Sequence, residues 1–393
     1  MIRMVTDKSK KPELRFKGFS DDWEQRKLSN VAEIVGGGTP STLNPDYWDG
    51  DIDWYAPAEI GKQIFANGSI RKITKDGLNH CSAKILPAYK TVLFTSRAGI
   101  GNMAILQRSA ATNQGFQSLV CHDNIDPYFV FSMGDNIKIK AKHIAAGSTF
   151  AEISGKKLGA LEFMFPDADE QKAIGAYFMS LDKLITLHQR KCENLKIIKK
   201  SMLDNLFPKN GEKIPRWRFK GFNDDWEQCK LGDEALEILA GGDVDKSRLV
   251  ENGKYPVIAN ALTDDGIVGY YEDNFRVKAP AVTVTGRGDV GHAQARKVNF
   301  TPVVRLLSVT SNHDVDFLAE AINQNNVVLE STGVPQLTVP KLASYKLFFP
   351  PTIEEERKIG QYFLNLDHLI TLHQSEVERL KKVKQFFLDK MFI

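Results

Sequence analysis

The stretch Ile174–Gln189, IGAYFMSLDKLITLHQ, returns near the end of the chain as Ile359–Gln374, IGQYFLNLDHLITLHQ, with twelve of sixteen positions identical and a spacing of 185 residues. In the first copy a heptad series is followed three residues later by a second series: Ile174, Leu181, His188, Leu195 and Met202, with Tyr177, Leu184, Lys191 and Ile198. The second copy repeats both: Ile359, Leu366, His373, Leu380 and Phe387, with Tyr362, Leu369, Glu376 and Val383. This a/d heptad pattern predicts a long helix with one apolar seam in each copy.

The ends of these helices are also marked in the sequence. Each copy starts with a small polar residue and a glutamate three residues later, Asp167 with Glu170 and Thr352 with Glu355, which predicts a helix N-cap. Pro208 predicts the end of the first helix. A helix of about 38 residues would be ~57 Å long and could not bury its seam alone. We therefore expect the two copies to pair antiparallel within the chain.

A polar layer is expected in the middle of that pair. Full antiparallel overlap would place His188 opposite Glu376, and Lys191 opposite His373, where polar seam residues fix the register of a coiled coil. The alternative is that the helices diverge there and that these four side chains are solvated.

A second repeat precedes each half. Pro12–Leu28, PELRFKGFSDDWEQRKL, reappears as Pro215–Leu231, PRWRFKGFNDDWEQCKL, with thirteen of seventeen positions identical and a spacing of 203 residues. Each copy of this leader carries three aromatic residues, namely Phe16, Phe19 and Trp23, and Phe219, Phe222 and Trp226. Aromatic residues in so short a segment predict docking onto the helices or onto a partner, with packing against the adjacent block as the alternative.

The repeats describe a tandem duplication. They divide the 393 residues into a tail and leader (1–28), a first variable block (29–166), a heptad helix (167–207), a linker and second leader (208–231), a second block (232–351) and a second helix (352–393). Residues 1–11 are expected to be frayed. The blocks mix turn-rich loops with short apolar runs, and Thr91–Thr95 and Ala281–Thr285 are predicted as buried strands. Because strands and helices do not alternate regularly, we expect α+β globules.

Composition describes an ordinary protein, with 42% hydrophobic and 26% charged residues and a net charge of +3. No apolar run approaches the roughly 18 residues of a membrane span, and the N-terminus is not a signal peptide, so we expect a cytoplasmic location. The four cysteines, Cys81, Cys121, Cys192 and Cys229, form no CxxC pair and predict neither disulfides nor a metal site.

A glycine-rich loop follows each predicted strand, with the sequences GIGNMA from Gly99 and GRGDVG from Gly286. A dinucleotide site would need a helix to begin at these glycines, but the residues that follow are predicted as strands. The aligned loops share the pattern T-x-R-x-x-[IV]-G, with Arg97 and Arg287 at the arginine. An arginine on such a loop in each half predicts contact with a phosphate or a guanine edge, and an ordinary surface arginine is the alternative. We find no catalytic motif and predict no catalytic residue.

These features together resemble the specificity subunit of Type I restriction-modification systems. The resemblance covers nearly the whole chain from Pro12, and it rests on the two leaders, GGGTPSTLNPDYWDGDIDW, TSRAGIG, ATNQGF and the EQKAIGAYFMSLDKLI helix start. It implies two target recognition domains separated by two conserved helices that pair as an antiparallel coiled coil. It also implies recognition of a bipartite, asymmetric double-stranded DNA target. A rod of ~57 Å is long enough for half-sites one turn, ~34 to 36 Å, apart.

The resemblance further implies the partners. They are two methyltransferase subunits, which methylate adenine, and two ATP-driven restriction subunits, which cleave DNA. S-adenosylmethionine, ATP and Mg would then bind those partners, and no cofactor would bind this chain.

Candidate DNA-binding residues lie on the loops of both blocks. They are Thr39, Ser41, Thr42, Arg97, Asn113 and Gln114 in the first block, and Asn260, Arg287, His292 and Arg296 in the second. Asn and Gln suit adenine and Arg suits guanine, and for each residue a plain solvent-exposed role is the alternative. The second block has Gly241-Gly242-Asp243-Val244 in place of GGTPST, so Thr39 and Ser41 have no counterpart there. A non-enzymatic adaptor that presents two protein-binding modules on a rod is the competing function, and a stand-alone enzyme is a third.

Overall fold

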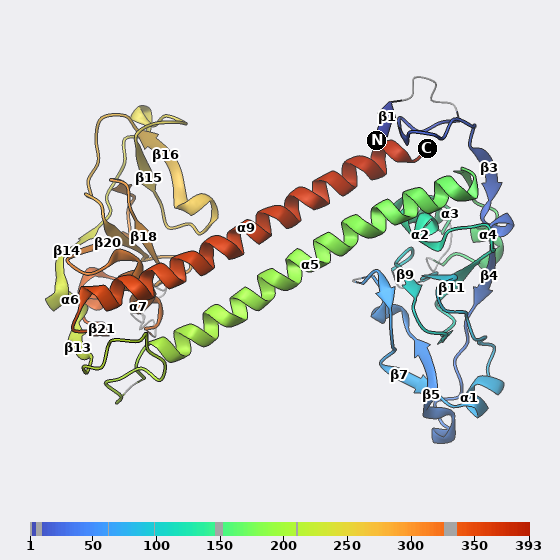
Figure 1. Cartoon of the computed structure of the whole chain (residues 1–393), viewed down its shortest axis with the longest axis horizontal. Helices are drawn as coiled ribbons and strands as arrows, with labels where there is room; N and C mark the ends of the chain where they lie inside the picture. The colour runs from blue at the N-terminus through green and yellow to red at the C-terminus, as the bar shows by residue number, and fades with distance from the viewer. Residues whose placement is uncertain are drawn as a thin grey trace. The chain divides into compact units, whose positions relative to one another are not determined.

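The computed structural model describes residues 10–61, 63–97, 99–145, 152–209, 211–325 and 336–393, and the backbone of residues 2–4. The chain forms two compact units, Met1–Leu187 with Glu376–Ile393, and His188–Ser375. Each unit is a mixture of helices and short strands, as the predicted α+β class requires (Figure 1). The long helices α5 (Ala168–Leu206) and α9 (Ile353–Met391) each contribute one part to either unit.

The first unit is built on a five-stranded sheet. Its order is β4 (Ala32–Gly36), β11 (Gln117–Cys121), β8 (Thr91–Phe94), β9 (Met103–Leu106) and β6 (Phe65–Ala66), antiparallel except for the last pair. A smaller sheet joins β10 (Ala111–Thr112), β5 (Trp48–Tyr55) and β7 (Arg71–Ile73). The shorter helices are α1 (Lys75–Asn79), α2 (Pro127–Ser132), α3 (Gly134–Ala145) and α4 (Gly155–Gly159).

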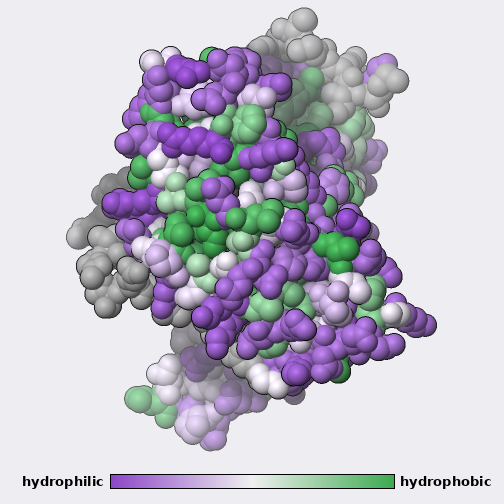
Figure 2. Space-filling model, turned by 90° about the vertical axis from the view of Figure 1, so that its left-hand side faces the viewer, coloured by the Kyte–Doolittle hydropathy of each residue, from purple (hydrophilic) through white to green (hydrophobic). Residues whose placement is uncertain are grey.

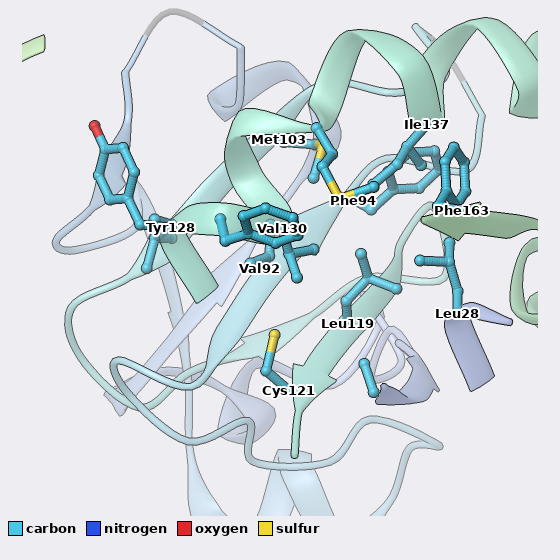
Figure 3. Close-up of a cluster of buried hydrophobic side chains, with 14 of the residues drawn as sticks. Leu28, Val92, Phe94, Met103, Leu119, Cys121, Tyr128, Val130, Ile137 and Phe163 are labelled. Atoms are coloured by element: carbon cyan, nitrogen blue, oxygen red, sulfur yellow. The ribbon is translucent and has the colours of Figure 1, made fainter. Parts of the chain in front are cut away.

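Alternation along the strands of the five-stranded sheet separates two of the cores of the first unit. Val92 and Phe94 belong to the core that includes α2, α3 and the long helices, whereas Leu93 belongs to the core shared with Tyr55 of β5. Figure 3 shows the first of these cores, in which Val92 and Leu119 of the sheet meet the helical residue Val130. The predicted strand at Thr91–Thr95 is therefore confirmed, and both of its faces are buried.

The second unit is likewise built on a main sheet and a smaller second sheet. Its main sheet is β14 (Ala235–Ala240), β20 (Leu306–Ser311), β17 (Ala281–Thr285) and β18 (Ala293–Arg296), and its second sheet is β16 (Ile267–Tyr271), β15 (Tyr255–Ile258) and β19 (Thr301–Pro302). The helices are α6 (Leu231–Glu234), α7 (Val315–Asn323) and α8 (Val339–Ala343). The predicted strand Ala281–Thr285 is confirmed. Figure 2 views the surface at this end of Figure 1, which is mainly hydrophilic with hydrophobic side chains gathered near the middle.

Each leader docks on the start of a long helix. Arg15 of β2 (Leu14–Phe16) makes a two-point ion pair with Glu170, at 2.6 and 2.7 Å, and Arg218 pairs with Glu355 at 2.7 and 2.8 Å. Trp23 also donates to Glu170, at 3.2 Å. The leaders continue into β3 (Glu24–Lys27), which pairs with β12 (Glu162–Phe165), and into β13 (Glu227–Lys230), which pairs with β21 (Lys346–Phe349). Among the leader aromatics, Phe16 meets Tyr177 of α5 and Phe219 meets Tyr362 of α9, whereas the Trp23 and Trp226 rings pack on Phe129 and Phe317 of the adjacent blocks. Docking onto the helices and its alternative, packing against the adjacent block, are therefore both observed.

Two expectations about chain ends need correction. Asp167 caps α5 by accepting from the backbone N–H groups of Asp169 and Glu170, but the Thr352 hydroxyl is buried without a partner among the described residues. At the N-terminus, β1 (Ile2–Met4) pairs with β2, so the tail is not wholly frayed. Residues 1 and 5–9 of that tail lie outside the described residues.

Within each unit the segments of α5 and α9 run antiparallel. In the first unit Lys384 Nζ lies 2.7 Å from Asp182 Oδ1, and the Tyr177 ring meets that of Phe387. In the second unit Lys199 Nζ lies 2.7 Å from Asp367 Oδ2. Because Asp367 and Lys384 are the repeat counterparts of Asp182 and Lys199, the two ion pairs are the same contact made once in each unit.

The seam follows a different phase of the heptad from the predicted one. The heptad series that begins at Ile174 lies on the seam as expected. The second series lies four residues after it, not three, since Ile185 is 8% exposed whereas Leu184 is 44% exposed. The companion positions are Phe178, Ile185, Cys192, Lys199 and Leu206, with Phe363, Ile370, Val377, Lys384 and Met391 in the second copy. Neighbouring apolar pairs such as Leu184-Ile185 fit either phase, so the sequence alone did not distinguish them.

The predicted polar layer changes accordingly. His188 Nδ1 lies 2.9 Å from His373 Nδ1, so the two histidines face each other. Glu376 instead makes an ion pair with Arg379 of its own helix, and Lys191 is exposed. The predicted pairing of His188 with Glu376 was wrong because it assumed the other seam phase.

Candidate nucleic-acid interface

The two arginine loops have the same backbone structure. In the first unit Thr95 N donates to the Asn102 carbonyl at 3.0 Å, and Gly101 N donates to the Thr95 carbonyl at 2.9 Å. In the second unit Thr285 N donates to the His292 carbonyl at 3.0 Å, and Gly291 N to the Thr285 carbonyl at 2.7 Å. Gly101 and Gly291 both have positive φ, 86° and 89°, which explains the shared glycine. Strands β9 and β18 follow, so no helix begins at these glycines as a dinucleotide site would require.

The threonine of the shared pattern holds the loop closed. The Thr95 hydroxyl donates to the Gly99 carbonyl at 2.7 Å and accepts from Asn102 N at 2.9 Å. The Thr285 hydroxyl likewise donates to the Asp289 carbonyl and accepts from His292 N. Arg97 is half-exposed and Arg287 is exposed, and neither side chain has a hydrogen bond or ion pair to the residues that the structure describes. Both arginines are therefore available to a ligand.

A glycine run lies against the turn beside each arginine loop. Gly38 N donates to the Thr112 carbonyl at 2.9 Å, and Gly242 N donates to the Pro302 carbonyl at 3.3 Å. A Cβ atom on Gly37 would fall 2.0 Å from the Asn113 carbonyl oxygen, and one on Gly241 would fall 2.1 Å from that of Val303. Only glycine allows so close an approach, which explains why both halves keep it.

In the first unit these segments bring four predicted residues together. The Thr39 hydroxyl donates to the Gln114 side-chain oxygen, and the Asn113 side-chain oxygen accepts from Gly115 N at 2.7 Å. A Cβ atom on Gly115 would lie 3.4 Å from Arg97 Nε, so the arginine side chain lies over this turn. Amide, hydroxyl and guanidinium groups thus converge on one surface, which can donate to and accept from a base edge.

Ser41 and Thr42 lie further along the same loop, and no contact brings either of them to that cluster within the described chain. The Ser41 hydroxyl accepts weakly from Leu43 N at 3.4 Å, and the Ser41 carbonyl accepts from Trp48 Nε1 at 3.1 Å. Both Ser41 and Thr42 are exposed.

In the second unit the predicted residues divide into free and engaged side chains. Asn260 donates to the Val304 carbonyl at 3.1 Å and accepts from Gly286 N at 2.8 Å, so its amide is used at both ends. Arg296 Nε donates to the Thr283 hydroxyl at 2.9 Å, and its Nη2 donates to the Gln294 side-chain oxygen at 2.8 Å. Burial lowers the pKa of Arg296. Asn260 and Arg296 therefore position their neighbours, whereas Arg287 and His292 are exposed.

Sequence reasoning missed Arg276 and Arg305 of this unit. Arg276 is exposed, and its Nη2 donates to the Asp243 carbonyl at 2.6 Å beside Gly242. Arg305 is also exposed and follows the turn residue Val304. The missing signal for Arg305 was the alignment of the two turns, in which Val304 and Arg305 stand where the first unit has Gln114 and Gly115.

No group of three or more potential metal ligands occurs among the described residues, and the four cysteines are free. Within the same part of the chain, no helix is both long and apolar enough to cross a membrane.

Each of the two equivalent α+β units has an arginine loop, a glycine run and a turn. The chain is therefore a duplicated protein whose two surfaces share a backbone structure but carry different side chains. Residues 20–196 and 223–382 match the family described as Type I restriction modification DNA specificity domain. The chain belongs to this family.

Individual relatives of the chain are specificity subunits of Type I restriction enzymes. The MjaIX specificity subunit of a Type I restriction enzyme from Methanocaldococcus jannaschii is 31% identical over 255 residues, or 60% of this chain and 57% of the relative. The EcoR124I/EcoR124II specificity subunit from Escherichia coli is 28% identical over 190 residues, 46% of this chain and 45% of the relative. The chain thus spans about half the length of these two curated relatives. The fold resembles the crystal structure of the Type-I restriction-modification S subunit from M. genitalium, with a TM-score of 0.68, 15% identity and coverage of 98% of this chain and 99% of that one.

Proposed function

We propose that this chain is the DNA specificity subunit of a Type I restriction-modification complex, with no catalytic site of its own. The observation that carries the proposal is the duplicated loop cluster, which has one backbone design and two different sets of side chains. A protein that reads a bipartite, asymmetric target needs two such surfaces, because shared backbone contacts position it while unlike side chains read different bases.

The remaining contacts suit the same function. The antiparallel contacts of α5 and α9 within each unit are those of an antiparallel coiled coil, which we propose as the element that sets the distance between half-sites. Methyltransferase subunits would supply S-adenosylmethionine and adenine chemistry, and restriction subunits would supply ATP-driven cleavage. Base flipping belongs to the methyltransferase in this scheme, because that enzyme must reach the adenine amino group.

The proposed base contacts are side chains that are free or that keep a donor or acceptor unused, as the NH2 groups of Asn113 and Gln114 do among the described residues. In the first unit they are Arg97, Gln114, Asn113 and Thr39, with Ser41 and Thr42 as outer contacts. In the second they are Arg287 and His292, with Asn260 and Arg296 as positioning residues.

Methylation mapping tests the function directly. The chain is produced with its methyltransferase in a host that lacks other adenine methylation, and methylated adenines are mapped across the genome. The proposal predicts one bipartite motif with a fixed gap and two different halves. Methylation without a sequence motif would contradict it, as would salt-independent binding of the complex to duplex DNA, because phosphate contacts make DNA affinity fall with salt. Salt-independent binding to a protein alone would favour the adaptor.

A further inference from the structure

The turn beside the arginine loop carries different side chains in the two units. In the first unit Phe116 N donates to the Asn113 carbonyl at 3.3 Å, which closes a four-residue turn over Gln114 and Gly115. In the second unit Leu306 N donates to the Val303 carbonyl at 3.0 Å, which closes the equivalent turn over Val304 and Arg305. Val304 of the second unit thus stands in place of Gln114 of the first, and Arg305 stands in place of Gly115.

Arg305 adopts a backbone conformation that side-chain-bearing residues rarely accept. Its φ is +70°, and the third position of a turn with positive φ is normally glycine. Its side chain is exposed and has no hydrogen bond or ion pair to the described residues, so no internal contact explains why an arginine stands there. Val304, beside it, is 40% exposed. Strained residues that are kept without an internal contact are typical of binding sites.

The neighbouring loops hold this turn in place. The Asn260 side chain donates to the Val304 carbonyl at 3.1 Å and accepts from Gly286 N at 2.8 Å, so it connects the turn with the arginine loop. A Cβ atom on Gly286 would fall 2.2 Å from the Arg305 carbonyl oxygen, so the two backbones are in close contact. Arg305 therefore extends from a rigid base next to the loop that carries Arg287.

We propose that Arg305 is a specificity-determining residue of the second half-site that contacts a guanine edge in the major groove, with Val304 against the methyl group of a neighbouring thymine. The inference rests on the proposed function and deepens it. A free guanidinium fits the two acceptors of guanine, and an exposed apolar side chain fits the thymine methyl group. The first unit has Gln114 at the position of Val304, and an amide there suits adenine, so the two halves of the target differ at this place.

The test uses Arg305→Gly and Arg305→Lys in the complex with the methyltransferase. Gly at this position removes the side chain and also relieves the strained φ, so the variant is expected to fold and to unfold at a temperature no lower than that of the wild type. Lys keeps the charge but lacks the planar fork that contacts guanine at two points. Both variants are scored by methylation across a duplex library randomised in both half-sites. Arg357→Ala, an exposed arginine on α9, is the matched control for loss of one charge.

The expected result is that both variants lose at least tenfold of the preference for guanine at one base pair of the second half-site, while the first half-site keeps its full preference. Arg357→Ala should leave both half-sites unchanged. An equal loss on every sequence with Arg305→Gly, together with wild-type behaviour of Arg305→Lys, would assign a phosphate contact and overturn the inference. Unchanged preference in both variants would also overturn it. A wild-type complex without any sequence preference would instead contradict the proposed function.

Discussion

Glu170 and Glu355 show how a single residue can have a different role from the one its sequence pattern predicts. Both follow a small polar residue by three positions, as capping glutamates do, yet both are buried in ion pairs with the arginine of a leader. Glu170 is fully buried and Arg15 is 1% exposed. A capping pattern is local, whereas the partner lies 155 residues away in the first unit and 137 in the second, so the sequence near the helix could not identify it.

The paired glycines have a comparable explanation. Gly175 and Gly360 are identical in the two helix copies, in the middle of a helical pattern where glycine is unfavourable. A Cβ atom on either would fall 2.3 Å from a carboxylate oxygen, that of Asp126 or of Asp314. These aspartates cap α2 and α7, so the glycines let a short helix begin directly on a long one.

His313 gives a prediction at this scale. Its ring nitrogens lie 2.7 Å from Glu356 and 3.1 Å from Glu234. Burial alone would lower the pKa of His313, but the carboxylates of Glu356 and Glu234 outweigh it and raise the pKa. Protonated His313 therefore stabilises the fold, fully so below the unfolded pKa of about 6.5, and this contribution is lost as pH rises through the higher folded pKa.

The measurement is urea unfolding between pH 6 and pH 9. The wild type should lose stability with rising pH, and His313→Gln should lack that component of the pH dependence. Identical pH profiles for the two proteins would show that His313 does not titrate with folding.

At the scale of elements, the two long helices and the equivalent strands Thr91–Phe94 and Ala281–Thr285 were predicted correctly from sequence, because each depends on local patterns of residues. The predicted phase of the seam was wrong, since both α5 and α9 carry apolar residues on both candidate stripes. The exposed stripe includes Leu184 and Leu369, 44% and 41% exposed, and the buried one Ile185 and Ile370, each 8% exposed. Only packing against the second helix and the unit's core distinguishes the stripes.

Adjacent substitutions test the seam. Ile185→Ala should lower the free energy of unfolding of the isolated chain by about 2 to 4 kcal/mol, because it removes buried side-chain volume. Leu184→Ala should cost less than about 1 kcal/mol, because that side chain is already largely in water. Urea titrations of the two variants compare them directly. A larger loss for Leu184→Ala would restore the predicted phase, and equal losses would contradict the observed one.

At the scale of the whole molecule, the duplication was readable from sequence because whole segments repeat. The candidate interface could be predicted only in part. Arg97 and Arg287 belong to a repeated motif, whereas Arg305 has no arginine counterpart in the first half. Asn260 has the residue type of a base reader, but its amide is used within the protein. Residue type alone does not reveal which side chains the fold has already engaged.

The proposed spacer function gives a prediction at this scale. Seven residues, a full heptad, inserted after both Gln189 and Gln374 would lengthen each helix by about 10.5 Å and preserve the seam. We expect the gap between the methylated half-sites to grow by about three base pairs, at 3.4 Å per step. Seven residues inserted after Gly211, in the linker outside both helices, are the control and should leave the gap unchanged. A constant gap in both variants would contradict the spacer.

The most direct test of two separate reading surfaces is to remove Arg97 and Arg287 one at a time and to map adenine methylation in each case. The account predicts that Arg97→Ala relaxes recognition at one half of the bipartite motif by ~1 to 3 kcal/mol, and that Arg287→Ala relaxes the other half by a similar amount. If both variants relaxed the same half, or if each weakened methylation equally at all sequences, the two arginine loops would not be independent readers of DNA.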